Sequence, residues 1–340
     1  MQVPLATGGA ELHAAGLRKA LEDAGHEADI VTLPFKGYPP QCVLDSMAIA
    51  NVVDLTDAFG TRIDWLIGLK FPAYYARHPK KSLWVLHQHR AAYDLWNTEY
   101  GDLHRFPEGY AVRRAIERAD RELFASVPVV YANSQNVARR LSLYCGAEAV
   151  ALYHPPPYAG RYFTAEAEDY LLFPSRLSAV KRQDLALEAL AQTRHPVRIE
   201  FLSISEESGY ADRLRAKAVA LGVTERIRWL GPVPLEVKLE KYARAVAVVF
   251  PPHDEDLGYV TLEAMLAAKP VITCVDSGGP TEFVLPWRTG LIAEPAPAAL
   301  AEAMDTVWEN RPQAAFWGRR AREYYASLNI SWANVVATLL

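Results

Sequence analysis

The sequence predicts an α/β protein of two domains, each built on a parallel sheet, and three observations support this. The chain has 340 residues, more than one hydrophobic core usually supports. Short apolar runs alternate with helical stretches, which is typical of parallel sheets covered by helices on both faces. Three consecutive prolines at 155–157 favour an extended connector near the middle of the chain.

The composition narrows the class of protein further. Hydrophobic residues make up 51% and charged residues 22%, so the chain is neither disordered nor fibrous. Lys and Arg number 36 against 40 Asp and Glu, a net charge of −4, which does not suit a protein that coats nucleic acid. We find no signal-peptide pattern and no apolar run long enough to span a bilayer. Three scattered cysteines indicate neither a disulfide framework nor a metal site, so we expect a cytoplasmic protein.

The expected elements follow the apolar runs. A first helix opens at Gly8-Gly9 and ends at Gly25. Further helices are expected over 185–191 and from about Val260 to before Pro270. Strands are expected at 28–33, 83–86, 127–131, 170–173, 198–202, 226–230, 245–250 and 271–274.

The proline segment divides the chain into expected domains at 1–154 and 155–325. A C-terminal helix at 326–340 is expected to pack back towards the first domain. In open parallel sheets, ligands bind beyond the carboxyl ends of the strands. Two such domains therefore predict a binding site in a cleft between them.

The segment 250–265 carries the strongest pattern, because a buried strand, a polar turn and a helix follow one another. Glu255 lies on the turn and Glu263 in the first helical turns, so the two carboxylates can hold different hydroxyls of one extended ligand. The alternative is that they only compensate the helix dipole. The start of this helix predicts an anion site whose backbone N–H groups come from Leu257, Gly258 and Tyr259.

Two further strand-to-helix turns point the same way. Arg176 and Lys181 are five residues apart after a strand, and a guanidinium with an ammonium suits a diphosphate. The alternative is a solvated basic loop. The third turn, with Ser277, Gly278 and Gly279, is either a tight turn or a phosphate contact.

The first half adds two smaller signals. Gly8 and Gly9 permit close approach of a ligand to a helix N-terminus. His87 and His89 follow a strand and would share one face of it, a geometry that can suit a metal. We find no third ligand, so a sugar-hydroxyl or charge contact is the better interpretation and no metal site is expected.

These residues give the chain a resemblance to the retaining family-four glycosyltransferases of the GT-B fold (glycosyl transferases group 1). The carriers are 8–11, Arg176 with Lys181, Glu255 with Glu263, and 277–280. The resemblance covers nearly the whole chain and is most specific over 170–295. It implies two Rossmann-like domains facing across a cleft. It also implies a UDP- or GDP-sugar donor used as substrate, retention of anomeric configuration, and neither a catalytic metal nor another cofactor.

The resemblance also implies residue roles in the second half. Glu263 should hold the ribose, and Glu255 should contact hydroxyls of the donor sugar. Arg176 and Lys181 should neutralise the diphosphate, where negative charge grows as the anomeric C–O bond breaks. The implied activity moves a hexose-type sugar to a hydroxyl acceptor, in glycan, polysaccharide or glycolipid assembly.

In the first half, Gly8 and Gly9 should approach the diphosphate, and His87 matches the cleft histidine of the family better than His89 does. Alternatives are another GT-B enzyme, an epimerase or a phosphorylase, and a pseudoenzyme that binds nucleotide. The order of the motifs favours transfer over the first two, and the intact charged residues argue against the third.

The sequence departs from the family pattern in two places. The glycine-rich turn expected after the second strand of the second domain is replaced by 202–208, so base or phosphate contacts are not expected there. Only seven residues precede Gly8, and they include Pro4, which is disfavoured in a central strand. We therefore expect that the natural reading frame begins upstream of Met1 or that this sequence is truncated, with about five to eight residues of Val/Ile-rich strand missing.

A basic helical segment adds a possible membrane contact. Its arginines recur at roughly helical spacing, at Arg113, Arg114, Arg118 and Arg121. Such a face can hold an anionic lipid surface at the inner side of the cell membrane. The alternative is a solvated helix face, because Glu117 and Glu122 lie among the arginines.

Overall fold

The computed structural model describes residues 8–203 and 209–340, which fall into two compact units. The first unit comprises the chain up to Pro157 together with Ser331–Leu340, and the second is Tyr158–Ile330. The chain thus leaves the first unit directly after the three prolines. The C-terminal helix α11 (Trp332–Leu339) belongs to the first unit, where it packs against α1 (Gly9–Asp23).

The first unit is built on a parallel sheet with the order β3-β4-β5-β6. Its strands are β3 (Leu66–Gly68), β4 (Lys81–Val85), β5 (Val130–Ala132) and β6 (Ala149–Ala151). Its other helices are α2 (Gln41–Val52), α3 (Gly109–Ser126) and α4 (Gln135–Cys145). A short antiparallel hairpin joins β1 (Asp57–Ala58) to β2 (Thr61–Arg62). Single 3-10 turns lie at Ala73–Tyr75, Arg90–Ala92 and Leu103–Arg105.

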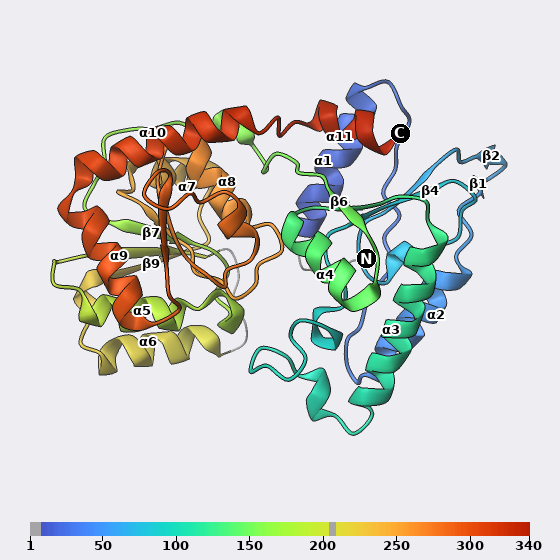
Figure 1. The fold of residues 1–340 in the computed structure, drawn as a ribbon, viewed down its shortest axis with the longest axis horizontal. Coiled ribbons are helices and arrows are strands. Elements are labelled where there is room, and N and C mark those ends of the chain that lie inside the picture. The colour runs from blue at the N-terminus through green and yellow to red at the C-terminus, as the bar shows by residue number, and fades with distance from the viewer. Residues whose placement is uncertain (1–7, 204–208) are drawn as a thin grey trace. The chain divides into compact units, whose positions relative to one another are not determined.

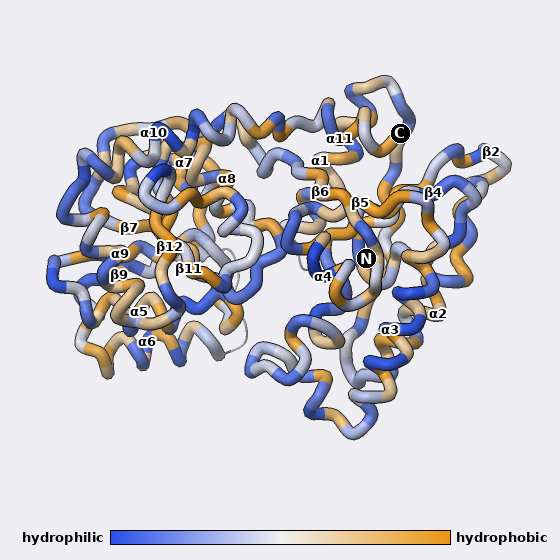
Figure 2. The backbone as a smooth tube through the Cα atoms, viewed as in Figure 1, coloured by the Kyte–Doolittle hydropathy of each residue, from blue (hydrophilic) through white to orange (hydrophobic). Residues whose placement is uncertain are grey.

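Alternation along β4 gives this sheet two apolar faces. Leu83 and Val85 enter one buried cluster, with residues of α2, α3 and α4. Trp84 points to the opposite face and packs with residues of α1 and α11. Successive strand residues face opposite sides of a sheet, so a continuous apolar strand is covered on both sides. Figure 2 shows β4 and β5 as mainly hydrophobic segments.

The second unit is a doubly wound parallel sheet with the order β12-β11-β10-β7-β8-β9. Its strands are β7 (Leu171–Pro174), β8 (Ile199–Leu202), β9 (Ile227–Gly231), β10 (Val248–Val249), β11 (Val271–Cys274) and β12 (Gly290–Ala293). The chain runs outward from β7 in one direction and from β10 in the other. The point between β7 and β10 is therefore the topological switch point, where such sheets bind ligands.

Helices cover both faces of this sheet (Figure 1). They are α5 (Gln183–Gln192), α6 (Tyr210–Ala220), α7 (Leu235–Arg244), α8 (Tyr259–Leu266), α9 (Pro297–Glu309) and α10 (Arg311–Ser327). Helix α9 packs against α5, and α10 packs against α8. Single 3-10 turns lie at Ala159–Arg161, Ala179–Lys181, Thr224–Arg226 and Gly279–Glu282.

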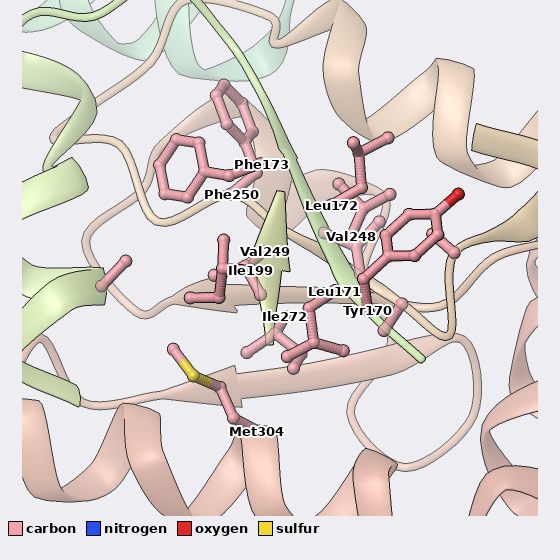
Figure 3. Packing of buried hydrophobic residues seen from close by; sticks show 14 of the residues in the cluster. Tyr170, Leu171, Leu172, Phe173, Ile199, Val248, Val249, Phe250, Ile272 and Met304 are labelled. Atoms are coloured by element: carbon pink, nitrogen blue, oxygen red, sulfur yellow. The ribbon is translucent and has the colours of Figure 1, made fainter. Parts of the chain in front are cut away.

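The core of the second unit lies on its central strands (Figure 3). Leu172 of β7 pairs in register with Val248 of β10, and both side chains are fully buried. Phe173 and Phe250, at the ends of the same two strands, are also buried. The apolar runs at 170–173 and 245–250, which were predicted as strands, thus supply the two neighbouring strands at the switch point.

The prediction of a strand at 28–33 is wrong, because these residues belong to no helix or strand. Asp29 Oδ1 accepts the N–H of Ile30 at 2.7 Å, which gives that backbone group a local partner instead of a strand neighbour. The expected strand at 245–250 is short, since only Val248 and Val249 form β10. The strands β3, β6 and β12 were not predicted from the sequence.

Residues 1–7 lie outside the described part of the chain, so the expectation about a missing first strand stays a prediction. The same holds for most of the unusual turn after β8, because residues 204–208 are not described. Among the described residues, none of the helices has the length and apolar character needed to cross a membrane.

Candidate functional site

The two central loops of the second unit meet at the switch point. The loop after β7 carries Arg176 and Lys181, and the loop after β10 carries Glu255. The N–H of His253 donates to the carbonyl of Val180 at 2.8 Å, which ties one loop to the other. The fold therefore brings together the charged residues that the sequence predicted from two separate segments.

Lys181 and Glu255 form an ion pair through Nζ and Oε2, and their side chains are only 12% and 17% exposed. The ammonium also lies 5.6 Å from the ring centre of Phe250. Burial lowers the pKa of Lys181, the Glu255 carboxylate opposes this shift, and Arg176 adds to it. Arg176 itself is exposed. The loop after β7 thus presents one partly buried and one exposed cation.

A third loop, after β11, holds the backbone of Glu255. The N–H of Glu255 donates to the carbonyl of Ser277 at 2.9 Å, and the N–H of Gly279 donates to the carbonyl of Glu255 at 2.8 Å. A Cβ on Gly279 would lie 2.6 Å from the carbonyl oxygens of Asp256 and Leu257. Only glycine fits this approach, so Gly279 supports the Glu255 loop.

The hydrogen bonds of the third turn give it a structural role. The N–H of Gly279 is bound to the carbonyl of Glu255. Ser277 is fully buried, and its Oγ accepts the N–H of Cys274 at 3.1 Å. These polar groups of Ser277 and Gly279 shape the turn, and a contact of either residue with a donor stays a prediction. Gly278, with φ of 67°, provides the left-handed bend between them.

Helix α8 begins where the sequence predicted, directly after the left-handed Gly258, whose φ is 81°. A Cβ there would lie 3.1 Å from Pro280 Cγ, so glycine is favoured both by the backbone and by the space. Leu257 is buried at 4% exposure. Burial and, to a smaller extent, Glu263 raise the pKa of Tyr259. The backbone at Leu257–Tyr259 forms the N-terminus of α8, next to Glu255.

Glu263 lies on α8 at 3% exposure and is held by partners that sequence reasoning missed. Lys238 Nζ donates to its Oε1 at 2.6 Å, and the Tyr242 hydroxyl donates to its Oε2 at 2.5 Å. Burial and Glu263 together raise the pKa of Tyr162. The sequence held one signal for these two partners, which is that Lys238 and Tyr242 are four residues apart and so share one face of α7.

A pocket opens at the carboxyl ends of β8 and β9. Its volume is about 180 Å³, and its lining comprises Leu177, Phe201, Ser203, Arg215, Trp229, Gly231 and Pro232. The rings of Phe201 and Trp229 are stacked, with centroids 4.5 Å apart and an interplanar angle of 16°. An apolar wall with one nearby guanidinium suits a flat, polar-edged group.

In the first unit, the N-terminus of α1 lies near the loop that follows β3. The N–H of Gly8 donates to Glu11 Oε2 at 2.8 Å, and Lys70 Nζ lies 3.9 Å from Glu11 Oε1. Leu69, which precedes Lys70 in the loop after β3, accepts the N–H of Leu86 through its carbonyl at 3.0 Å. This contact links the Gly8 turn to the segment that carries His87. Gly9, the first residue of α1, is exposed.

The two histidines follow a strand as expected, since β4 ends at Val85 and both lie in the loop after it. His87 Nδ1 lies 2.7 Å from the carbonyl of Gln88. His89 packs against the rings of Phe35 and Phe71, and burial followed by the charge of His87 lowers its pKa to about 4. No group of three or more metal-ligating side chains occurs in the described part of the chain. The two histidines therefore gain no third ligand there.

A buried carboxylate in the first unit was not predicted. Asp120 on α3 is fully buried and accepts hydrogen bonds from the hydroxyls of Tyr74, Tyr75 and Tyr93. Burial raises the pKa of Asp120, and the three hydroxyls oppose that shift. The four residues, which we name the Asp120 cluster, join three separate segments of the unit.

Several known proteins are similar to this chain in sequence or in structure. Residues 160–324 match the family Glycosyl transferases group 1. A D-inositol 3-phosphate glycosyltransferase from Frankia alni is 32% identical over 167 residues, which cover 45% of this chain and 41% of the relative. The D-rhamnosyltransferase WbpZ from Pseudomonas aeruginosa is 32% identical over 162 residues, which cover 47% of this chain and 41% of that protein. The chain thus spans less than half the length of these curated relatives.

The fold comparison extends over both units. The structure of HepE from Anabaena in complex with UDP and glucose is similar with a TM-score of 0.70 at 18% identity, covering 99% of this chain and 96% of that one. At this identity the likeness concerns the fold, two Rossmann-like domains of the GT-B class. The sequence match to the family of group 1 glycosyltransferases is confined to residues 160–324, which lie within the second unit, whereas the likeness in fold extends over nearly the whole chain.

Proposed function

We propose that the protein is a retaining glycosyltransferase that moves a hexose-type sugar from a UDP- or GDP-sugar to a hydroxyl acceptor. The implied setting is glycan, polysaccharide or glycolipid assembly. The observation that carries the proposal is the meeting of Arg176, Lys181 and Glu255 at the switch point, next to the N-terminus of α8. The presence of UDP and glucose in the structure of HepE supports a nucleotide-sugar donor.

The two cations would act on the leaving group. When the anomeric C–O bond breaks, its electron pair stays on the diphosphate, and negative charge grows on the phosphate oxygens. Arg176, Lys181 and the N–H groups at the start of α8 would stabilise that charge where it develops. We propose that the reaction needs no metal, because these groups already supply positive charge.

The Lys181–Glu255 pair suggests how the site changes when a donor binds. Without donor, each of the two charges compensates the other at low exposure. A diphosphate would offer Lys181 a new anionic partner and leave Glu255 to accept hydrogen bonds from hydroxyls of the donor sugar. Glu255 would then orient the sugar, in keeping with the role implied by the motif.

Glu263 would hold the ribose, with Lys238 and Tyr242 fixing its carboxylate. The pocket lined by Phe201 and Trp229 would receive the base. Gly278 and the backbone of Leu257–Tyr259 remain proposed donor contacts, as do Gly8, Gly9 and His87 from the first unit.

Membrane contact through α3 is supported only in part. Arg113 Nε and Arg114 Nη1 both donate to Glu117, at 2.8 and 3.2 Å, and Arg113 also lies 4.7 Å from the ring centre of Trp96. Arg113 is therefore engaged within the unit, while Arg114, Arg118 and Arg121 are exposed. Any contact with anionic lipid would fall to these three, with Glu117 and Glu122 beside them.

Calorimetry with UDP and with GDP tests the donor site directly. We expect one of the two to bind to the full chain in the presence of a strong chelator, and Arg176→Ala to weaken that binding. Product analysis with the matching nucleotide sugar then separates transfer from epimerisation and phosphorolysis. Absence of binding by both nucleotides would contradict the proposal, and binding lost on chelation would contradict metal independence.

A further inference from the structure

Arg182 lies where the three loops of the second unit's site meet, and its sequence context gave no sign of this. The residue is 7% exposed. Its Nε donates to the carbonyl of Pro251 at 2.7 Å, and its Nη2 donates to the carbonyl of Pro252 at 2.6 Å. The guanidinium therefore holds the start of the loop that carries Glu255.

The same guanidinium reaches the third loop through Asp276. Nη1 donates to Asp276 Oδ2 at 2.8 Å, and Nη2 donates to Oδ1 at 2.7 Å. Such two-point pairing between a fork-shaped cation and a carboxylate fixes both position and orientation. Asp276 also accepts the N–H of Asp254 through its backbone carbonyl at 2.9 Å. One side chain thus spans the loops after β10 and β11 from its own place after β7.

The backbone of Arg182 adds a second observation. Its φ is 57°, in the left-handed region that favours glycine, and it stands between Lys181 and the first residue of α5. A non-glycine residue in this conformation is strained and persists only where its surroundings hold it. The four side-chain hydrogen bonds are the contacts that hold it here.

We propose that Arg182 is a positioning residue that clamps the three loops so that Lys181 and Glu255 meet in one geometry. This inference rests on the proposed function, in which Lys181 acts on the leaving group and Glu255 contacts the donor sugar. Arg182 itself has no assigned contact with substrate. It acts through its neighbour in sequence, Lys181, and through the loop of Glu255.

The test compares Arg182→Lys and Arg182→Gly with a matched control, Arg226→Lys, in the full chain. Arg226 is also an arginine of the second unit that holds a backbone carbonyl, since it donates to Leu190 at 2.6 Å and to Thr193 Oγ1 at 2.8 Å. It directly precedes β9 and so lies at the amino ends of the strands, whereas the site lies at their carboxyl ends. Glycine at 182 keeps the left-handed backbone, and lysine keeps the charge without the fork.

The first measurement is an NMR titration of Lys181 in protein carrying isotope-labelled lysine, with its signal assigned by Lys181→Arg. Glu255, Arg176 and Asp256 are the charged groups that act on Lys181. Loosening the clamp changes both the burial of Lys181, which lowers its pKa, and its pairing with Glu255, which raises its pKa, so we expect the midpoint to differ from wild type in both Arg182 variants. The Arg226→Lys midpoint should match wild type even if its thermal stability falls. Unchanged Lys181 midpoints in the Arg182 variants would overturn the proposal.

The second measurement is turnover of the nucleotide sugar that wild type accepts, together with affinity for the matching nucleoside diphosphate, UDP or GDP. Misplacement of reacting groups can cost on the order of 100-fold in rate, so turnover should fall by about that factor in Arg182→Lys while the nucleotide affinity stays within about threefold. Added guanidinium ion should restore part of the turnover in Arg182→Gly and none in Lys181→Ala. Wild-type turnover in Arg182→Lys would also overturn the proposal. If wild type binds neither UDP nor GDP and turns over neither kind of nucleotide sugar, the donor assignment fails, and the Lys181 titration still decides the role of Arg182.

Discussion

Asp120 in the first unit and Glu255 in the second are both carboxylates with close partners, but their surroundings differ. Asp120 is fully buried and receives three neutral tyrosine hydroxyls from two other segments of its unit. Glu255 keeps 17% exposure and pairs with one cation on a neighbouring loop. A fully buried carboxylate cannot change its hydrogen-bond partners unless the surrounding structure opens. A partly exposed ion pair can exchange one partner for a ligand.

The same contrast separates the partners of the two carboxylates. The Asp120 cluster joins α3 to the loops around β4, so we expect its loss to lower the stability of the whole first unit. The Lys181–Glu255 pair joins loops that already share backbone hydrogen bonds with each other and with the loop after β11. Changes at the pair should therefore alter binding and turnover more than stability.

The largest effect is expected for Lys181→Ala. Removing a charge aimed at the developing negative charge of a leaving group typically lowers turnover by about 100- to 1000-fold. Steady-state turnover of the nucleotide sugar that the protein accepts is the measurement. Lys269→Met is the matched control, because Lys269 is another buried lysine of the same unit and donates to the carbonyl of Ala165. Equal losses in both variants would mean that the effect is structural.

Asp120→Asn should mainly lower stability. The substitution removes the charge that strengthens three hydrogen bonds and turns an amide N–H₂ towards a hydroxyl, which should cost roughly 2–3 kcal/mol in the free energy of unfolding. Chemical denaturation measures this directly. Tyr93→Phe deletes one of the three donors and should cost about 1 kcal/mol. A variant as stable as wild type would show that the cluster does not support the first unit.

Glu263→Ala should weaken nucleotide binding by roughly 1.5–3 kcal/mol, because a hydrogen bond from the ribose to a charged acceptor is lost. Calorimetry with the nucleoside diphosphate that binds wild type gives the value. Glu255→Gln is the comparison, since it should lower turnover and leave free-nucleotide affinity nearly unchanged. Equal loss of affinity in both variants would show that the two glutamates do not divide the donor between ribose and sugar.

The smallest effect concerns pH. His89 is held neutral, with its pKa lowered to about 4, whereas an unfolded histidine titrates near 6.5. The unfolded chain therefore takes up a proton first, and stability is lost as pH falls from about 6.5 towards 4. Because His89 is partly exposed, the loss attributable to it should be about 1–2 kcal/mol. Unfolding free energies of wild type and His89→Gln, compared at neutral and acidic pH, should converge on acidification. A difference that does not vary with pH would contradict the assignment.

Several elements follow from local sequence alone. Strand β11 coincides with its predicted bounds, and α8 begins one residue from its predicted start, because a glycine with positive φ precedes an apolar helix. Gly25 ends the first helix as expected, with φ of 90°. In each case the signal lies within a few residues, where backbone preferences act directly.

Other features depend on partners far along the chain. The alternating run at 28–33 forms no strand, because strand pairing needs a neighbour that local sequence does not supply. Ser277 and Gly279 form hydrogen bonds within the turn that holds Glu255, which the sequence pattern alone did not indicate. Whether a segment forms a strand or a turn of this kind depends on the backbone groups that folding brings next to it.

Apolar periodicity and the positions of glycine and proline are local properties, so the parallel α/β design and the loops that carry the charged residues of the second unit could be predicted without a structure. The folded structure was needed to show that Lys238 and Tyr242 hold Glu263, that Asp120 is enclosed by three tyrosines, and that Arg182 contacts two loops besides its own. The physical reason is that a side chain's burial and hydrogen-bond partners are set by segments brought together on folding, which a local pattern does not contain.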